Sequence, residues 1–176
     1  MTTVTQNPNL EQRFNLYDTD DNGRIDRSDF EAEALRVIRA FREDPDLPRG
    51  QAVMNSHVSV YNYLARKAGV GDEGMNLADF TGVVNKEIND RGDIGFSQVL
   101  RPMIEAMVAL CDTDGDGKIQ LQEYQQWITA TGASNADSEE SFRQIDKDDD
   151  GALSIEELVD AVKQYHFGQS SNPMLG

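Results

Sequence analysis

The sequence predicts an all-α fold made of four helix–loop–helix units arranged in two pairs. Three acidic stretches share one pattern of acids, glycine and aliphatic residues: DTDDNGRIDRSDF at 18–30, DTDGDGKIQLQEY at 112–124 and DKDDDGALSIEEL at 146–158. Apolar residues recur at helical spacing before and after each stretch. Repetition of this kind indicates one structural unit used several times along the chain.

The flanking apolar residues place a helix on each side of every acidic loop. Around the first loop they are Leu10, Phe14 and Tyr17, then Phe30, Ala34, Val37, Ile38 and Phe41. Around the second loop they are Met103, Met107 and Leu110, then Tyr124, Trp127 and Ile128. Around the third they are Phe142 and Ile145, then Leu158, Val159, Val162 and Tyr165. A twelve-residue acidic loop between two such helices is the EF-hand.

Composition excludes several classes of function. The chain carries 16 basic and 32 acidic residues, a formal net charge of -16, and a chain this acidic repels the phosphates of nucleic acid. The start, MTTVTQNPNL, has neither a basic nor an apolar segment, so it is not a signal peptide. No run approaches roughly 18 consecutive apolar residues, and Cys111 has no cysteine partner. We therefore expect a cytoplasmic monomer without a membrane span.

The acidic loops have the pattern of calcium ligands. Calcium takes six to eight oxygen ligands, and an EF-hand loop supplies them from positions one, three, five, seven, nine and twelve. A role in helix capping alone would explain Ser154 and Glu157, but not an acid or amide at positions one, three and five with glycine at six in three copies. The candidate ligands are Asp18, Asp20, Asn22, the Arg24 carbonyl, Asp26 and Asp29 in loop 18–29; Asp112, Asp114, Asp116, the Lys118 carbonyl, Gln120 through water and Glu123 in loop 112–123; and Asp146, Asp148, Asp150, the Ala152 carbonyl, Ser154 (directly or through water) and Glu157 in loop 146–157.

The first loop differs from the other two at its last position. Asp29 is one methylene shorter than the glutamate at position twelve of the other loops, so chelation by both of its oxygens is harder. Magnesium takes six ligands at shorter distances than calcium, so the shorter acid should narrow the preference for calcium. We expect a cation in this loop, calcium first, with magnesium as a competitor.

The first unit needs a partner, because a single EF-hand leaves an apolar face uncovered. Residues 68–79 supply one when Met75 is aligned with Ile25 and Asp79 with Asp29. In this register Ala68 and Val70 stand where acids are needed, so the second hand is degenerate. The predicted units are an N-terminal pair (1–90), a C-terminal pair (91–167) and a flexible tail (168–176). The glycines of NDRGDIG (89–95) predict a bend that folds the two pairs against each other.

The chain as a whole resembles the sarcoplasmic calcium-binding protein family. The resemblance rests on four EF-hands with a degenerate second one, on Asp29 closing the first loop, and on the long connection between the first two hands. Arg13-Phe14 and DFEAEA (29–34) are similar to bacterial calerythrin-type members. The resemblance implies a compact all-helical fold, ions in the first, third and fourth hands, and calcium buffering or signalling in the cytosol.

Two functions follow from these features, and a third is set aside. A calcium buffer or transporter would bind about three ions with coupled folding. A sensor would instead expose an apolar groove for a target helix, commonly lined with methionine, whereas Met103 and Met107 have the spacing of core residues. An enzyme is not expected, because neither His57 nor His166 belongs to a catalytic pattern.

Overall fold

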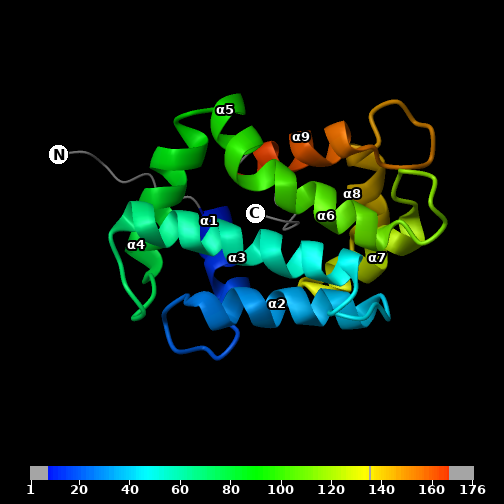
Figure 1. Cartoon of the computed structure of the whole chain (residues 1–176). Coiled ribbons are helices and arrows are strands. Elements are labelled where there is room, and N and C mark those ends of the chain that lie inside the picture. Colours follow the sequence, from blue (N-terminus) through cyan, green and yellow to red (C-terminus); the bar gives the residue numbers. More distant parts are fainter. Residues whose placement is uncertain (1–7, 135, 167–176) are drawn as a thin grey trace.

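The computed structural model describes residues 8–134 and 136–166. The predicted tail (168–176) lies outside these residues. The structure is all-helical, and the described part contains no strand longer than an isolated bridge (Figure 1). The elements are α1 (Pro8–Tyr17), α2 (Arg27–Ala40), α3 (Pro48–Ala68), α4 (Leu77–Val84), the π-helix η1 (Asn85–Asn89), α5 (Asp93–Gly95), the π-helix η2 (Phe96–Leu100), α6 (Arg101–Cys111), α7 (Leu121–Ala130), α8 (Ser138–Ile145) and α9 (Ile155–His166).

Each loop pairs with a second loop through one short antiparallel bridge. Ile25 and Met75 exchange two backbone hydrogen bonds, both 2.8 Å long. Ile119 and Leu153 do the same, at 2.9 and 2.7 Å. All four side chains are fully buried, so each bridge also joins the apolar interiors of its two hands. The first bridge pairs Ile25 with Met75, which is the register predicted from the sequence for the degenerate hand.

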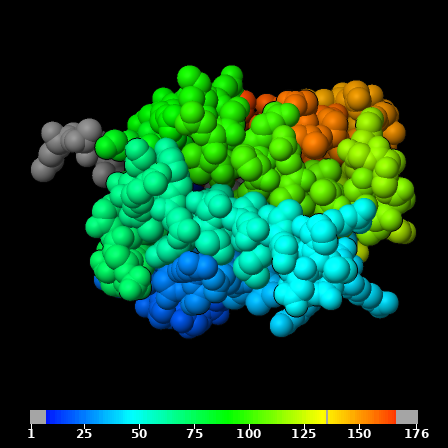
Figure 2. Space-filling view, in the orientation of Figure 1, coloured from blue at the N-terminus to red at the C-terminus, as the bar shows by residue number. Residues whose placement is uncertain are grey.

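The two halves share one hydrophobic core, as the compact fold class requires. Helix α3 lies along α2 and α6, and α2 also contacts α7 (Figure 1). The first and last described helices are joined by Asn9 Nδ2 donating to the Tyr165 carbonyl (2.9 Å) and by the Tyr165 hydroxyl donating to the Asn9 carbonyl (2.6 Å). In Figure 2 the two halves of the chain form a single body.

The link between the halves is a sharp bend. Helix α4 continues into η1, the chain turns at Gly92 (φ +57°), and α5 runs through η2 into α6. A Cβ atom on Gly95 would lie 2.6 Å from the Ile88 carbonyl oxygen, so the two arms of the bend touch through their backbones. Two π-helical segments on either side of it mark a distorted rather than a straight connection.

A buried ion pair lies beneath the first hand. Arg13 Nη2 on α1 donates to Glu33 Oε1 on α2 at 2.8 Å, and both side chains are fully shielded from solvent. The Arg13 guanidinium also lies over the Tyr17 ring, 4.1 Å from its centroid. His57 on α3 is buried beside this pair, with Nδ1 2.8 Å from the Val53 carbonyl. Burial lowers the pKa of His57 below its usual value, and Arg13 lowers it further while Glu33 opposes the shift.

One helical stretch of the described residues, Asp93–Cys111, is long and apolar enough to cross a membrane by length and composition. The stretch contains the charged residues Asp93, Arg101 and Glu105, so the sequence shows no continuous apolar run there. Core helices of globular proteins satisfy the same criterion. Here Met103 and Met107, together with other apolar side chains of the stretch, are buried in the core.

Candidate metal centre

Three loops each gather carboxylates around one point. In each, the acids of positions one, three and twelve offer oxygen atoms that all lie within 4.8 Å of one another. The three sets are Asp18, Asp20 and Asp29; Asp112, Asp114 and Glu123; and Asp146, Asp148 and Glu157. Grouped carboxylate oxygens are the donors that hard cations prefer, and the loops contribute no nitrogen or sulfur ligand to these sets.

The acid at position one folds its own loop. Asp18 Oδ1 accepts a hydrogen bond from the Asn22 amide (3.1 Å), and Oδ2 accepts one from the Gly23 amide (2.8 Å). The equivalent bonds to Asp112 are 3.1 and 2.7 Å, and those to Asp146 are 3.2 and 2.9 Å. Because each carboxylate holds the amides of positions five and six, the loop keeps its turn around the acidic centre.

The backbone follows the same path in all three loops. Positions four and six have positive φ in each: Asp21 and Gly23, Gly115 and Gly117, Asp149 and Gly151. Position six has φ between 78° and 82°, a region that glycine enters without steric cost. The glycine in the sequence pattern is therefore required by the turn.

The acids at position twelve, Asp29 and Glu123, accept the same pair of backbone hydrogen bonds in the first and second loops. Glu123 accepts hydrogen bonds from the Gln120 amide and the Thr113 amide, each 2.9 Å long. Asp29 accepts the equivalent pair, from the Asp26 amide at 2.9 Å and the Thr19 amide at 3.1 Å. An aspartate thus makes the two contacts that a glutamate makes in the second loop, although its side chain is one methylene shorter.

These acids also begin the helices that follow them. Asp26 and Asp29 form a capping box at the start of α2, and Gln120 and Glu123 form one at the start of α7. Ser154 and Glu157 share reciprocal bonds of the same kind, 2.9 Å from the Ser154 amide and 3.2 Å from the Glu157 amide. The same carboxylates therefore take part both in helix capping and in the acidic clusters. For Ser154 and Glu157, a capping role does not exclude a role as cation ligands.

The position-five side chains each accept a hydrogen bond from the backbone amide two residues further along, and Asn22 also donates to Asp20 of the first cluster at 3.0 Å. The side-chain oxygen of Asn22 accepts from the Arg24 amide, that of Asp116 from the Lys118 amide and that of Asp150 from the Ala152 amide, at 2.9, 2.9 and 3.0 Å. Lys118 of the second acidic loop also pairs with Asp150 of the third. At position nine, Gln120 bonds to Asp116, and the Ser154 hydroxyl lies 3.0 Å from Glu157 Oε2.

The pKa values of the acids at positions three and five shift in opposite directions. At position three, burial raises the pKa of Asp20, Asp114 and Asp148, and neighbouring carboxylates raise it further. At position five, the Lys118 amide lowers the pKa of Asp116, and the Lys118 side chain lowers that of Asp150. A bound cation would favour the ionised form of the position-three acids and so oppose this rise in pKa.

The loop at 68–79 differs in backbone as well as in side chains. Helix α3 continues through Ala68, and positive φ occurs at Gly69 and Gly74, loop positions two and seven. Glu73 occupies position six but has no positive φ. No group of three candidate metal ligands is found there among the described residues. The sequence had indicated missing ligands, and the structure adds a different path of the chain.

Comparisons with known proteins agree with this geometry. A family profile for an EF-hand domain pair matches residues 8–129, and a profile for a single EF hand matches residues 139–162. Calerythrin from Saccharopolyspora erythraea is 37% identical over 177 residues, covering 100% of both chains. The chain belongs to the EF-hand family, in its calerythrin and sarcoplasmic calcium-binding protein branch.

Two further relatives extend this assignment. The alpha-B and -A chains of sarcoplasmic calcium-binding protein from Penaeus sp. are 26% identical, over 85% of this chain and 82% of theirs. A solved structure of a Streptomyces coelicolor calcium-binding protein superposes with a TM-score of 0.81 at 29% identity, covering 93% of this chain and 98% of that one. Recognition of this family from its motifs is confirmed. The chain is a calcium-binding EF-hand protein and not an enzyme.

Sequence reasoning missed two features around the site. Arg13 and Glu33 stand 20 positions apart, and charged residues are normally expected at the surface, so their burial as a pair has no local signal. The contact between Lys118 and Asp150, which joins the two C-terminal loops, also needs the fold to be known. The expected pairing of the two C-terminal loops could have suggested this contact, because it brings together residues that are 32 positions apart in the sequence.

Proposed function

We propose that this EF-hand protein is a cytosolic calcium buffer or transporter that binds three calcium ions, one in each acidic loop. The observation that carries the proposal is the convergence of three carboxylates within 4.8 Å in three separate loops. The proposed ligands are the oxygens at positions one, three, five, seven, nine and twelve of those loops, with Gln120 acting through water. The 68–79 loop would bind no ion.

Electrostatics supports coupling between ion binding and folding. Three divalent cations would add six positive charges to a formal net charge of -16, giving -10. Burial first, and neighbouring carboxylates second, raise the pKa of Asp20, Asp114 and Asp148, which is consistent with carboxylates gathered in each loop. Because a cation relieves this crowding only in the folded loop, binding should stabilise the native state.

Magnesium is proposed as a competitor, chiefly in loop 18–29. Asp29 accepts the same two backbone hydrogen bonds as Glu123 although its side chain is shorter. A loop drawn in by one methylene favours the smaller ion, which needs shorter distances and fewer ligands. The two C-terminal loops keep glutamate and should favour calcium more strongly.

The surface supports a monomer in the cytoplasm. Within the described residues, Leu47 and Ile94 are the large apolar side chains that are exposed, which is too few for an extensive apolar interface. Cys111 is buried and unpaired, which is compatible with a reducing compartment. The sarcoplasmic name of the crustacean relatives points to the same compartment.

A sensor is the second candidate. The Streptomyces coelicolor structure is described as a basis for prokaryotic calcium-mediated regulation, which is a regulatory role for that protein. For this chain, a sensor would have to open apolar surface when calcium binds. Its described core is closed, with Met103 and Met107 fully buried.

Fluorescence of an apolar-surface dye separates the two candidates. Chelator-stripped protein is titrated with calcium in a constant magnesium background, and bound calcium is counted by calorimetry in the same buffer. A buffer should close around its ions, so dye fluorescence should fall as three ions bind. A rise in fluorescence would favour the sensor, and a count other than three would contradict the assignment of the loops.

A further inference from the structure

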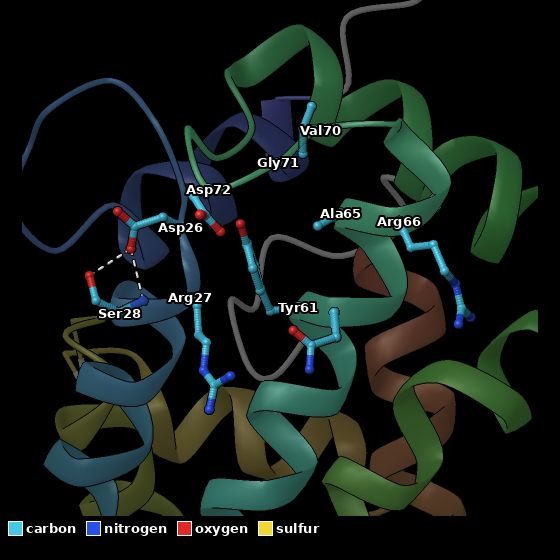
Figure 3. Close-up of a pocket in the computed structure, with 10 residues that line it drawn as sticks. Asp26, Arg27, Ser28, Tyr61, Ala65, Arg66, Val70, Gly71 and Asp72 are labelled. Carbon is cyan, nitrogen blue, oxygen red and sulfur yellow. Dashed lines mark hydrogen bonds between the residues drawn. The ribbon is translucent and has the colours of Figure 1, made fainter.

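A pocket of about 640 Å³ lies beside the degenerate loop and next to Asp26 of the first acidic loop (Figure 3). Its walls come from the start of α2, the C-terminal half of α3 and the 68–79 loop. Asp26, Tyr61 and Asp72 line it together with the apolar side chains of Ala65 and Val70. The pocket therefore combines acidic groups with a short apolar wall.

Tyr61 is directed into this pocket by its packing. The residue is 6% exposed, and its ring lies against Phe30, with the centroids 5.5 Å apart. Figure 3 shows its hydroxyl pointing into the pocket, toward Asp72. Within residues 8–134 and 136–166 this hydroxyl has no protein hydrogen-bond partner, and it is not among the fully buried polar atoms, so its oxygen faces the open pocket and is available to a ligand.

Nearby carboxylates make the electrostatic potential at the Tyr61 hydroxyl negative. Burial raises the pKa of Tyr61, and the carboxylates of Asp26, Asp72, Glu73 and Asp29, in that order, raise it further. Asp72 forms no ion pair or hydrogen bond through its side chain in the described part of the chain. A positive group beside the hydroxyl would offset these charges.

The two arginines of the pocket do not supply that positive group. Arg27 Nε donates to Glu31 Oε1 at 2.7 Å, and the Arg66 guanidinium lies 5.7 Å from the centroid of the Tyr63 ring. Both guanidinium groups point away from the Tyr61 hydroxyl in Figure 3. The acidic end of the pocket is therefore open to a cation from outside.

We propose that this pocket binds an alkylammonium group, either of a free polyamine or of a lysine side chain. The ammonium would donate to the Tyr61 hydroxyl and to the Asp72 carboxylate, and its methylene chain would lie along Ala65 and Val70. A bare divalent cation fits less well, because calcium or magnesium needs at least six oxygen ligands and the degenerate loop lacks acids at positions one and three.

Occupancy of the pocket is coupled to the first loop through Asp26. This step rests on the proposed function, in which Asp26 is the position-nine ligand of loop 18–29. The degenerate loop also contacts that site through Arg24 Nη1, which donates to the Gly74 carbonyl at 3.2 Å. By linkage, any factor by which the amine changes calcium affinity at this loop equals the factor by which calcium changes amine affinity.

The test titrates the calcium-saturated full chain with butylammonium chloride and follows backbone amide shifts by NMR. We expect saturable shifts around Tyr61 and Asp72, with none for the neutral isostere n-butanol. Tyr61→Phe keeps the ring, and Asp72→Asn keeps the size; each should weaken binding by about fivefold, the effect of one hydrogen bond. Asp46→Asn is the control, since it removes an exposed acid at the other end of α3.

A second pair of titrations distinguishes the two sources of the amine. Tighter binding of spermidine than of a blocked glycyl-lysyl-glycine peptide identifies a polyamine, and the reverse identifies a lysine side chain. Equal affinity of the native, Tyr61→Phe and Asp72→Asn proteins, or shifts with n-butanol alone, would overturn the proposal. Counting bound calcium in the same samples keeps this result separate from the three-ion proposal.

Discussion

The two EF-hand pairs have the same backbone bridge but different contents. In the C-terminal pair both loops hold converged carboxylates, and Lys118 of one loop contacts Asp150 of the other. In the N-terminal pair one loop holds such a cluster, while the other has a different backbone path and no metal-ligand group among its described residues. Below the N-terminal pair lies the buried Arg13–Glu33 ion pair, which has no counterpart with both side chains fully buried in the described C-terminal half.

This difference teaches that the pairing of two hands and the gathering of carboxylates in a loop are separable properties. The Ile25–Met75 bridge is as short as the Ile119–Leu153 bridge, although only the second joins two acidic loops. Burial of the bridge side chains therefore maintains the pair whether or not each loop binds a cation. The degenerate hand supplies apolar surface, including Met75, that packs against its partner.

Breaking the buried ion pair of the N-terminal half should have the largest effect. Glu33→Gln leaves the fully buried Arg13 without a counter-charge, which costs about 3–5 kcal/mol of the free energy of unfolding. Urea unfolding of the calcium-free protein measures this loss. Glu31→Gln breaks the exposed pair with Arg27 on the same helix and should change stability little. Equal losses in the two variants would show that burial of the pair is unimportant.

Removing one carboxylate of the C-terminal pair should abolish one ion site. Changes next to metal ligands cost 10–100-fold in affinity, so Glu123→Gln, which alters a proposed ligand itself, should cost more than about 100-fold. Calorimetry should count two tight calcium ions in place of three. The control is Glu11→Gln, on an exposed position of α1. Three tight ions in Glu123→Gln would remove this residue from the ligand set.

Lengthening the acid of the first loop should make the two pairs more alike. Asp29→Glu restores the glutamate of the C-terminal loops, and we expect the calcium-to-magnesium preference of loop 18–29 to rise on the order of tenfold. Competition titrations with the Glu123→Gln/Glu157→Gln background isolate this loop. Asp79→Glu, at the same position of the degenerate loop, is the matched control and should leave the preference unchanged. A lower preference for calcium in Asp29→Glu would contradict the role assigned to the short side chain.

The smallest effect concerns pH, through His57 beside the buried pair. Its pKa in the folded protein is lowered by burial, below the unfolded value of about 6.5, so the unfolded state binds more protons as the solution is acidified. Stability should therefore be complete above pH 6.5 and fall below it, by at most about 1.4 kcal/mol per pH unit.

Unfolding of calcium-free protein between pH 7.5 and 5.5 tests this expectation. His57→Phe should flatten the slope in that range, whatever its effect on stability at pH 7.5. An unchanged slope would mean that other groups account for the pH dependence.

The sequence predicted those parts of the molecule that depend on local spacing. The acidic loops and the glycine at position six follow from patterns within a single loop, and comparison of two such loops aligns Met75 with Ile25. The backbone path of the 68–79 loop was not predictable, because Gly69 and Gly74 permit several turns and the packing against Ile25 selects one.

Contacts between distant helices also lay beyond the sequence. Nothing in the spacing of Arg13 and Glu33 says that both will be buried, and nothing in Tyr61 says that its hydroxyl will face Asp72 across a pocket. These features arise where three or more elements meet, so they require the tertiary structure. The individual ligand roles in the three loops stay predictions until an ion is located.

The bend between the halves should protect the connecting segment from proteolysis. A flexible linker would be the first site for a protease, because the chain must leave its fold locally to enter an active site. Here the two arms of the bend touch at Gly95 and the Ile88 carbonyl, with Phe96 and Ile88 both buried. Limited digestion should therefore spare residues 89–96, and neither EF-hand pair should be released as an independent fragment.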